Sequence, residues 1–247
     1  MTRLDEHYTD PRLVGIYDIE NPRGVDTDFY VDLAADLDAR RIIDLGCGTG
    51  LLTREFATPG RQVFGVDPSG AMLAFARRQP GAERVYWIES DAAALDPLTA
   101  DLLVMTGNVA QIFLTDAEWQ AALAAIHATL RSGGVLAFES RNPTARGWEE
   151  WNRTDSYAEF DSPHGPMASW VEVTGVEGSH VRFEGYNVFK ATDEVVVAHS
   201  ELRFRSREEL TGSLQAAGFA VEHVYGNWHK EPMRGDSPVM VFVARRN

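Results

Sequence analysis

The sequence predicts an α/β fold: a doubly wound, mainly parallel sheet with helices on both faces, and an antiparallel β-rich insertion after the fifth strand. Strand-like and helix-like segments alternate from about residue 25 to 141. Residues 142–166 show no helical or strand-like period of apolar residues, and strand-like runs joined by turn residues follow. We therefore divide the chain into an N-terminal cap segment (1–24), a core (25–141 and 206–247) and an insertion (142–205).

The first half of the core shows the alternation clearly. Phe29, Leu33 and Leu37 recur every four residues, which is typical of an amphipathic helix. The apolar run 41–45, closed by glycines, suits a buried parallel strand. The segments that follow are expected to be a helix at 51–57, a strand at 62–66, a helix at 69–78, and strands at 85–89 and 101–105.

Helix-capping patterns mark the helices in the second half of the chain. Thr115 and Glu118 have capping-box spacing and open an alanine-rich helix that ends before Ser132-Gly133-Gly134. Ser206 and Glu209 form a second such box, and Gly218 suits a helix end. The remaining strands are predicted at 135–139, 168–174, 181–189, 195–204, 219–225 and 239–244.

The composition restricts the class of protein. Hydrophobic residues make up 44% of the chain, which is enough for a packed core. No apolar run approaches the roughly 20 residues of a membrane span, and the polar N-terminus lacks the features of a signal peptide. Cys47 is the single cysteine, so an internal disulfide and a cysteine-rich zinc site are excluded. We expect a cytoplasmic protein without a membrane partner.

The charge argues against nucleic acid as a partner. Acidic residues outnumber basic residues 37 to 23, and the formal net charge is −14. Binding a phosphate backbone requires clustered Lys and Arg side chains, whereas the basic pairs in this chain stand apart at the ends of predicted elements.

A glycine-rich loop, Gly46 to Gly50, lies between a predicted buried strand and a helix. Asp67 ends the next strand, 21 residues after Gly46, close to the spacing at which a carboxylate accepts hydrogen bonds from ribose hydroxyls. The loop reads G-x-G-x-G rather than the nicotinamide fingerprint G-x-G-x-x-G, and Leu51 stands where a P-loop has lysine. Asp44 would repel a diphosphate but attract an ammonium or sulfonium group. The loop therefore favours a cationic, phosphate-free nucleotide.

These residues resemble a known family. The run from Ile42 to Gly50 is similar to motif I of class I S-adenosylmethionine-dependent methyltransferases. Segments similar to the family's later motifs follow in the same order along the chain. They are Val66-Asp67-Pro68-Ser69 with Met72-Leu73, Ser90-Asp91-Ala92, Ala100 to Val104, and Leu130 to Leu136. The resemblance implies S-adenosylmethionine as the cofactor and a Rossmann-like, seven-stranded sheet with its last strand antiparallel.

The resemblance also implies a set of cofactor contacts. The glycines would line the methionine part, Asp67 would bind the ribose, and Met72 and Asp91 would contact the adenine. The full set is Tyr17, Asp44, Gly46, Cys47, Gly48, Gly50, Leu51, Asp67, Pro68, Met72, Asp91, Ala92, Thr106, Gly107 and Asn108. Alternatives remain for four of them: Asp44 as a cap of its own loop, Met72 as a core residue, Asp91 as a turn residue and Tyr17 as a packed aromatic.

The sequence does not identify a catalytic residue. The cofactor's methyl group is already activated, so alignment of a nucleophile can suffice without an acid or base. Polar residues near the expected site entrance are weak catalytic candidates, with a surface or supporting role as the alternative: His7, Tyr17, Asn108, Glu139, Arg141 and His229. The seven histidines show no paired spacing, so we expect no metal site.

Five of the aromatic residues of the insertion suit a lid or pocket wall: Trp148, Trp151, Tyr157, Phe160 and Trp170. One face of its strands is polar, so it equally suits a homodimer surface. Insertions after strand five resemble those of small-molecule and amino-sugar methyltransferases. We therefore expect transfer to a small-molecule nitrogen or oxygen rather than carbon, with protein or RNA methylation, or cofactor binding without transfer, as alternatives.

Overall fold

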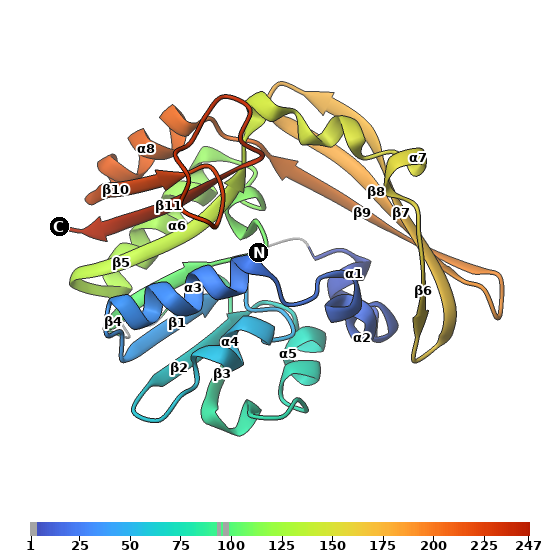
Figure 1. The fold of residues 1–247 in the computed structure, drawn as a ribbon, viewed down its shortest axis with the longest axis horizontal. Helices are drawn as coiled ribbons and strands as arrows, with labels where there is room; N and C mark the ends of the chain where they lie inside the picture. Colours follow the sequence, from blue (N-terminus) through green and yellow to red (C-terminus); the bar gives the residue numbers. More distant parts are fainter. Residues whose placement is uncertain (1–3, 93–94, 96–98) are drawn as a thin grey trace.

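A computed structural model describes residues 4–92, 95 and 99–247. It contains a seven-stranded sheet and a separate four-stranded sheet, which lie side by side with the N-terminal helices between them (Figure 1). No helix within the described ranges is long and apolar enough to cross a membrane.

The seven-stranded sheet forms the core. Its strands are β1 (Arg41–Leu45), β2 (Gln62–Asp67), β3 (Val85–Glu89), β4 (Ala100–Met105), β5 (Leu130–Arg141), β10 (Phe219–Tyr225) and β11 (Val239–Arg246). Their order is β10-β11-β5-β4-β1-β2-β3. β1 pairs in parallel with β2 and β4, whereas β11 is antiparallel to both β5 and β10. This arrangement confirms the doubly wound sheet with a reversed last strand.

Helices cover both faces of this sheet because successive residues of each buried strand point to opposite sides. Ile42 packs in one apolar cluster with Phe56, and Ile43 packs in the other with Trp119. The helices of the core are α3 (Val25–Asp36), α4 (Leu51–Phe56), α5 (Gly70–Ala76), α6 (Asp116–Thr129) and α8 (Arg207–Ala216), with the 3₁₀ turns η1 (Ala82–Arg84) and η3 (Val109–Gln111). α3 and α4 lie on the first face, and α6 and α8 on the second.

Both predicted capping boxes are present. Thr115 and Ser206 each accept the backbone N–H three residues on, and Glu118 and Glu209 return the contact. β5, however, begins at Leu130 rather than at 135. Leu130 pairs with Ala100 and Val135 pairs with Leu102, so the predicted stop at Ser132-Gly133-Gly134 is an irregular stretch between two paired parts of one strand.

The insertion folds as an antiparallel meander, as predicted. Its strands are β6 (Ala158–Ser162), β7 (Gly165–Glu177), β8 (His180–Phe189) and β9 (Glu194–Arg203), preceded by η4 (Pro143–Ala145), η5 (Gly147–Glu150) and α7 (Arg153–Ser156). β6 is absent from the sequence prediction. It is a five-residue edge strand without a buried residue, so it carries no apolar alternation to detect.

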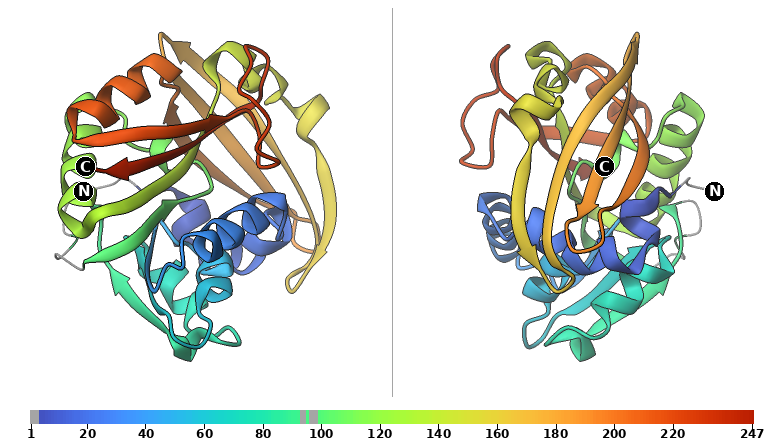
Figure 2. Two further views of the ribbon diagram at one scale, coloured as in Figure 1. Left: turned by 60° about the vertical axis from the view of Figure 1, so that its left-hand side comes forward. Right: turned by 90° about the vertical axis from the view of Figure 1, so that its right-hand side faces the viewer.

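The N-terminal segment forms two helices, α1 (Glu6–Thr9) and α2 (Pro11–Glu20), capped by Asp5 and Asp10. They lie between the core and the insertion in Figure 1 and in the left-hand view of Figure 2. Leu13 and Ile16 of α2 share an apolar cluster with Met167 and Phe189 of the insertion. The segment thus joins the two sheets.

Candidate active site

The glycine-rich loop turns from the end of β1 into α4 at the carboxyl edge of the parallel sheet. The backbone N–H groups of Gly46 and Cys47 both donate to the Val66 carbonyl of β2, at 2.7 and 3.1 Å. Gly50 adopts a left-handed conformation (φ +72°) as the N-cap of α4. The loop is therefore fixed to the neighbouring strand before it meets any ligand.

Gly48 is the position where this loop is open. Its φ is +53°, and a side-chain carbon placed there would meet no atom within 4 Å. At Gly46 and Gly50 such a carbon would instead lie 2.4 Å from Val109 and 2.3 Å from Trp87. Gly48 thus leaves room for a ligand against the backbone, whereas the other two glycines allow close packing within the protein.

Asp67 lies beside this opening at the end of β2. Its two carboxylate oxygens accept the backbone N–H groups of Gly48 and Ser69, each at 2.8 Å. Burial raises the pKa of Asp67, and these two N–H donors act against the rise. The carboxylate therefore orders the loop and keeps further acceptor capacity for a ligand.

Asp44 supplies a second buried carboxyl group below the loop. Its Oδ2 accepts the Thr53 hydroxyl at 2.6 Å, but its buried Oδ1 has no hydrogen-bond partner among the described residues. Burial raises the pKa of Asp44 to about 7. A buried acceptor without a donor suits a positively charged group, so the site fits a cofactor with an ammonium and a sulfonium.

The N-terminal helices close over this loop. The Thr49 hydroxyl donates to Asp18 Oδ1 at 2.5 Å, and the Ser69 hydroxyl donates to the Tyr8 carbonyl at 2.5 Å. The Tyr8 and Tyr17 rings lie 6.1 Å apart. Burial and the nearby carboxylate of Asp67 raise the pKa of Tyr17 to about 12, so its phenol keeps its proton at neutral pH.

Glu139 is buried near the end of β5, where it accepts the Tyr30 hydroxyl and, at 2.7 Å, the Asn108 backbone N–H. Burial raises the pKa of Glu139 to about 6. Asn108 is left-handed (φ +65°), and its buried Oδ1 has no partner in the described part of the chain. Glu139 therefore holds the turn after β4 in place, with both of its oxygens engaged.

Arg141 ends β5 at the same carboxyl edge. Its Nη1 donates to Gln111 Oε1 at 3.3 Å, and its guanidinium carbon lies 5.1 Å from the centre of the Trp151 ring. Trp151 in turn packs on Phe183 with ring centres 4.8 Å apart. Burial lowers the pKa of Arg141.

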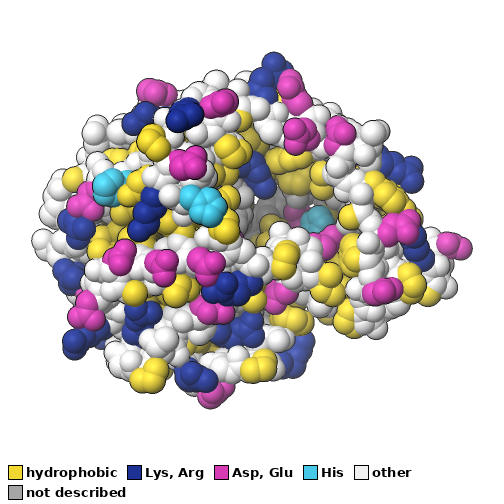
Figure 3. Space-filling view, in the orientation of Figure 1, with side chains coloured by type: hydrophobic (Ala, Val, Ile, Leu, Met, Phe, Trp, Pro, Cys, Tyr) yellow, Lys and Arg dark blue, Asp and Glu magenta, His cyan; other side chains and the backbone are white. Residues whose placement is uncertain are grey.

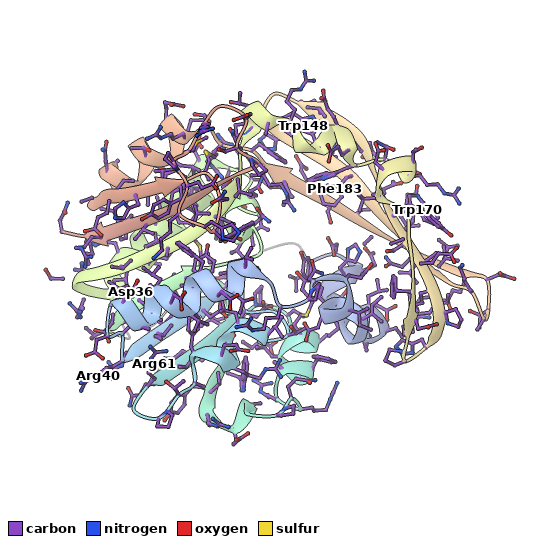
Figure 4. All side chains as sticks on the ribbon, viewed as in Figure 1. Asp36, Arg40, Arg61, Trp148, Trp170 and Phe183 are labelled. Carbon is purple, nitrogen blue, oxygen red and sulfur yellow. The ribbon has the colours of Figure 1, made fainter. Side chains whose placement is uncertain are left out.

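A cleft separates the carboxyl edge of the core from the inner face of the insertion sheet (Figure 3). Gly185 and Asn187 of β8 belong to that inner face, because they contact His7 of the N-terminal segment. The His7 ring lies against Gly185, and its Nε2 lies 3.3 Å from Asn187 Nδ2. Phe183 shares this face by strand alternation and points toward the cleft, while Asp36, Arg40 and Arg61 lie at the far end of the core (Figure 4).

The five aromatic residues predicted to form a lid or pocket wall do not form one surface. Trp148 and Trp151 pack on Phe204, with ring centres 4.7 and 6.0 Å from that of Phe204. Phe160 packs against the apolar cluster shared by α2 and the insertion. Trp170 stacks on Tyr186 on the outer face, and Tyr157 packs beside it, 43% exposed. Because strand neighbours alternate between faces, Trp170 lies on the side of the sheet opposite Phe183.

The structure brings most of the predicted site residues to one edge of the sheet. Gly46 to Leu51, Asp67, Pro68, Asp91 and Ala92 follow the ends of β1, β2 and β3, and Thr106, Gly107 and Asn108 follow β4. Met72 is buried at the start of α5, and Cys47 is buried in the loop itself. His229 is exposed on the loop after β10 and does not join this group.

Several residues of the site carried no signal in the sequence: Tyr8, Asp18, Thr49, Thr53, Tyr30 and Gln111. Thr49 lies in the glycine-rich loop and Thr53 just after it, so the sequence could have predicted that they lie near the site. It could not have predicted that they donate to Asp18 and Asp44. The other four act through contacts with distant residues. Within the described ranges, no group of three or more His, Cys, Asp or Glu side chains is arranged to hold a metal ion.

Comparison with known proteins agrees with this geometry. A family model described as a methyltransferase domain matches residues 42–134. The malonyl-[acyl-carrier protein] O-methyltransferase of Enterobacter lignolyticus is 35% identical over 113 residues, 43% of this chain and 42% of that protein. The cypemycin N-terminal methyltransferase of a Streptomyces species is 24% identical over 88% of this chain and 87% of its own. The chain spans about half the length of the curated relatives that it matches first.

Solved structures match over nearly the whole chain. A methyltransferase from Clostridium acetobutylicum superposes with a TM-score of 0.77 at 16% identity, covering 94% of this chain and 96% of its own. CalS10 of Micromonospora echinaspora, an amino pentose methyltransferase with S-adenosylmethionine bound, gives a TM-score of 0.71 at 26% identity, with 94% and 97% covered. Residues 42–134 therefore match a methyltransferase domain, and the fold of the chain is similar to that of a methyltransferase with S-adenosylmethionine bound.

Proposed function

We propose that this protein transfers the methyl group of S-adenosylmethionine to a nitrogen or oxygen atom of a small molecule, by direct in-line displacement. One observation carries the proposal. The open backbone at Gly48 and the unpartnered Asp44 Oδ1 lie at the sheet edge that faces the cleft, so a cofactor held there would meet a second ligand in the cleft.

Each cofactor contact has a physical basis in this chain. Asp67 keeps acceptor capacity for the ribose hydroxyls, and Asp44 Oδ1 would accept from the ammonium group. Asp91 and Ala92, after β3, would lie beside the adenine. The bound cofactor supplies a methyl group that is already electrophilic. The protein's part is then to orient the acceptor and to exclude water.

Neither Tyr17 nor Glu139 is arranged as a free general base. Tyr17 stays protonated at neutral pH, and both oxygens of Glu139 are engaged. Two further candidates, His7 and Arg141, belong to the cleft walls. The acceptor would therefore be an amine presented without its proton, or an oxygen that releases its proton to solvent or to another part of the substrate.

A small substrate is supported by relatives that match the whole chain. CalS10 is described as an amino pentose methyltransferase, and KedS8 of Streptoalloteichus, with a TM-score of 0.74 at 20% identity, as a sugar N-methyltransferase. The N-terminal helices and the insertion lie on the same side of the core (Figure 1), beside the hollow that the space-filling view shows (Figure 3), which favours a compact molecule over a macromolecule.

The decisive experiment offers the purified protein S-adenosylmethionine labelled with tritium in the methyl group. Three acceptor pools from bacterial cells are compared: low-molecular-weight metabolites, total protein and total RNA. Label in the metabolite pool supports the proposal. Label confined to protein or RNA would replace it with macromolecule methylation. Cofactor binding by calorimetry without transfer to any pool would indicate a binding protein.

Two further expectations stay predictions, cytoplasmic localisation and no binding of nucleic acid, and a homodimer formed through the insertion stays the alternative to a lid. Fractionation of the source cells, a shift assay with duplex DNA and structured RNA, and sedimentation equilibrium test them in turn. The insertion as a lid over the cleft is our preferred interpretation, because its inner face already packs on the N-terminal helices.

A further inference from the structure

Arg141 is a cation at the cleft whose charge is not balanced by an ion pair. Its side chain makes one hydrogen bond, to the neutral Gln111, and it forms no ion pair within 4.0 Å among the described residues. The guanidinium group has five N–H donors, so most of them remain available. A half-buried guanidinium of this kind is costly unless an anion meets it.

No described group around Arg141 forms a direct ion pair with it. Tyr8 and Tyr17 are close enough to act on it electrostatically, but the pKa of Tyr8 is raised by Tyr17 and by burial, and the pKa of Tyr17 is raised by burial, so both phenols are neutral. Glu139 acts on Arg141 electrostatically, but its two oxygens accept hydrogen bonds from Tyr30 and Asn108, and it makes no hydrogen bond or ion pair with Arg141. Arg141 is therefore a cation without a direct anionic partner, in the described part of the chain, at the carboxyl edge of the core.

Trp151 provides a flat apolar surface at the same point. Its ring lies against Arg141 on one side and against Phe183 and Phe204 on others. The Trp151 carbonyl accepts the Val173 N–H of β7 at 3.0 Å, which ties the residue to the insertion sheet. The ring is therefore held in place by the insertion, while the guanidinium is held by the core.

We propose that Arg141 and Trp151 form the substrate-recognition site, and that the substrate is a small acid: an apolar or aromatic body carrying a carboxylate or phosphate. The oxyanion pairs with the Arg141 guanidinium, and the body packs on Trp151 and Phe183. This inference rests on the proposed function, since it names the substrate class of the same cleft. Arg141 acts as a specificity residue, because it binds a handle of the substrate rather than the reacting atom.

The test uses protein saturated with S-adenosylhomocysteine, so that it does not depend on turnover. Calorimetry compares phenylacetate and phenyl phosphate with the neutral phenylacetamide. We expect at least one anion to bind about tenfold more tightly than the amide, because a charge-assisted bidentate contact is stronger than a neutral one. The anion that binds more tightly shows whether the substrate's oxyanion is a carboxylate or a phosphate.

Two variants assign the preference to a residue. Arg141→Gln should abolish it, and Arg141→Lys should keep part of it, because the charge stays and the planar fork is lost. Arg153→Gln is the matched control: Arg153 also lies over a tryptophan, 4.4 Å from the Trp170 ring centre, but Trp170 belongs to the outer face. That control should keep the full preference.

Equal affinity for the anions and the amide in the unaltered protein would overturn the inference, as would absence of binding by either anion. A preference that persists in Arg141→Gln, or is lost equally in Arg153→Gln, would also overturn it.

In the tritium experiment, label in a neutral or cationic metabolite fraction alone would contradict this inference but not the proposed function. Absence of label from every metabolite fraction would contradict the proposed function itself.

Discussion

At the scale of single residues, the site depends on carboxyl groups that the fold removes from water. Asp44 and Asp67 are 1% and 7% exposed, and neither forms an ion pair in the part of the chain that the structure describes. Burial of an unpaired carboxyl group is unfavourable, and a cationic ligand reverses that penalty. Keeping Asp44 ionised, with its Oδ1 lacking a donor among the described residues, therefore costs the free protein stability.

Asp67→Ala is expected to weaken S-adenosylmethionine binding by about 3 kcal/mol, or roughly a hundredfold in Kd, because the ribose hydroxyls lose a charged acceptor. Calorimetry with purified protein measures this. Asp101→Ala is the control. Asp101 likewise accepts two backbone N–H groups, from Arg40 and Arg41 at 2.9 and 2.8 Å, but it lies at the opposite edge of the sheet. Similar losses of affinity in both variants would contradict the assignment.

Asp44→Asn is expected to stabilise the free protein at alkaline pH. The folded pKa of Asp44, about 7, exceeds its ordinary value of 3.8. The folded state therefore keeps a proton that the unfolded state loses, and the free energy of unfolding falls as pH rises from about 4 to about 7. Removing the carboxylate should raise the free energy of unfolding at pH 8 by about 1 to 4 kcal/mol.

Urea unfolding at pH 4 and pH 8 checks this prediction, because the variant and the unaltered protein should differ only at the higher pH. Affinity for S-adenosylmethionine should show the opposite effect. It should rise with pH through about 7 in the unaltered protein, as Asp44 ionises, and be weaker and nearly independent of pH in the variant. A variant that is not stabilised at pH 8 would show that Asp44 is ionised at little cost.

At the scale of elements, α1 and α2 connect the cofactor loop with the insertion. Asp18 accepts the Thr49 hydroxyl on the loop side, while Asn187 contacts His7 and Ser200 donates to Asp5 on the insertion side. A cofactor cannot enter or leave beneath this segment without breaking some of these contacts. We therefore expect the segment to control cofactor exchange.

Ile16→Ala should accelerate dissociation of S-adenosylmethionine about tenfold or more. Ile16 is fully buried between α2 and the insertion, and a cavity there would lower the cost of lifting the segment by about 2 to 4 kcal/mol. Stopped-flow displacement measures the rate. Leu214→Ala is the control. Leu214 on α8 is equally buried, but it lies in the apolar cluster between α8 and the core sheet rather than beside the insertion. Equal acceleration in both variants would mean that general destabilisation is responsible.

Element-level prediction from sequence succeeded where the signal was local. Capping boxes, turn glycines and apolar periods located the strands and helices of the core, because each of these constraints acts within a few residues of backbone. It failed for β6 and for the N-terminal helices. β6 has no buried residue, and α1 has none either, so neither shows an apolar period.

At the scale of the whole molecule, the net charge of −14 acts against compactness. Raising NaCl from about 10 to 150 mM should screen this repulsion and raise Tm by about 2 to 4 °C at pH 8, equivalent to about 1 kcal/mol. Thermal unfolding followed by circular dichroism measures it. The effect should vanish at pH 5, near the isoelectric point of about 4.9. A salt effect of equal size at both pH values would point to ion-specific binding instead.

Local patterns were sufficient to predict the doubly wound core and to locate the glycine-rich loop and Asp67 beside it, because backbone geometry and the hydrophobic period depend on residues within single elements. The contacts that define the cleft arise from packing between elements far apart in the chain. Tyr30 reaches Glu139 across 109 positions, and His7 reaches Asn187 across 180. Such pairs have no local signature, since each partner's sequence neighbourhood is compatible with many other surroundings. The identity of the groups that face the substrate therefore emerged only once the two sheets and the N-terminal helices were packed together.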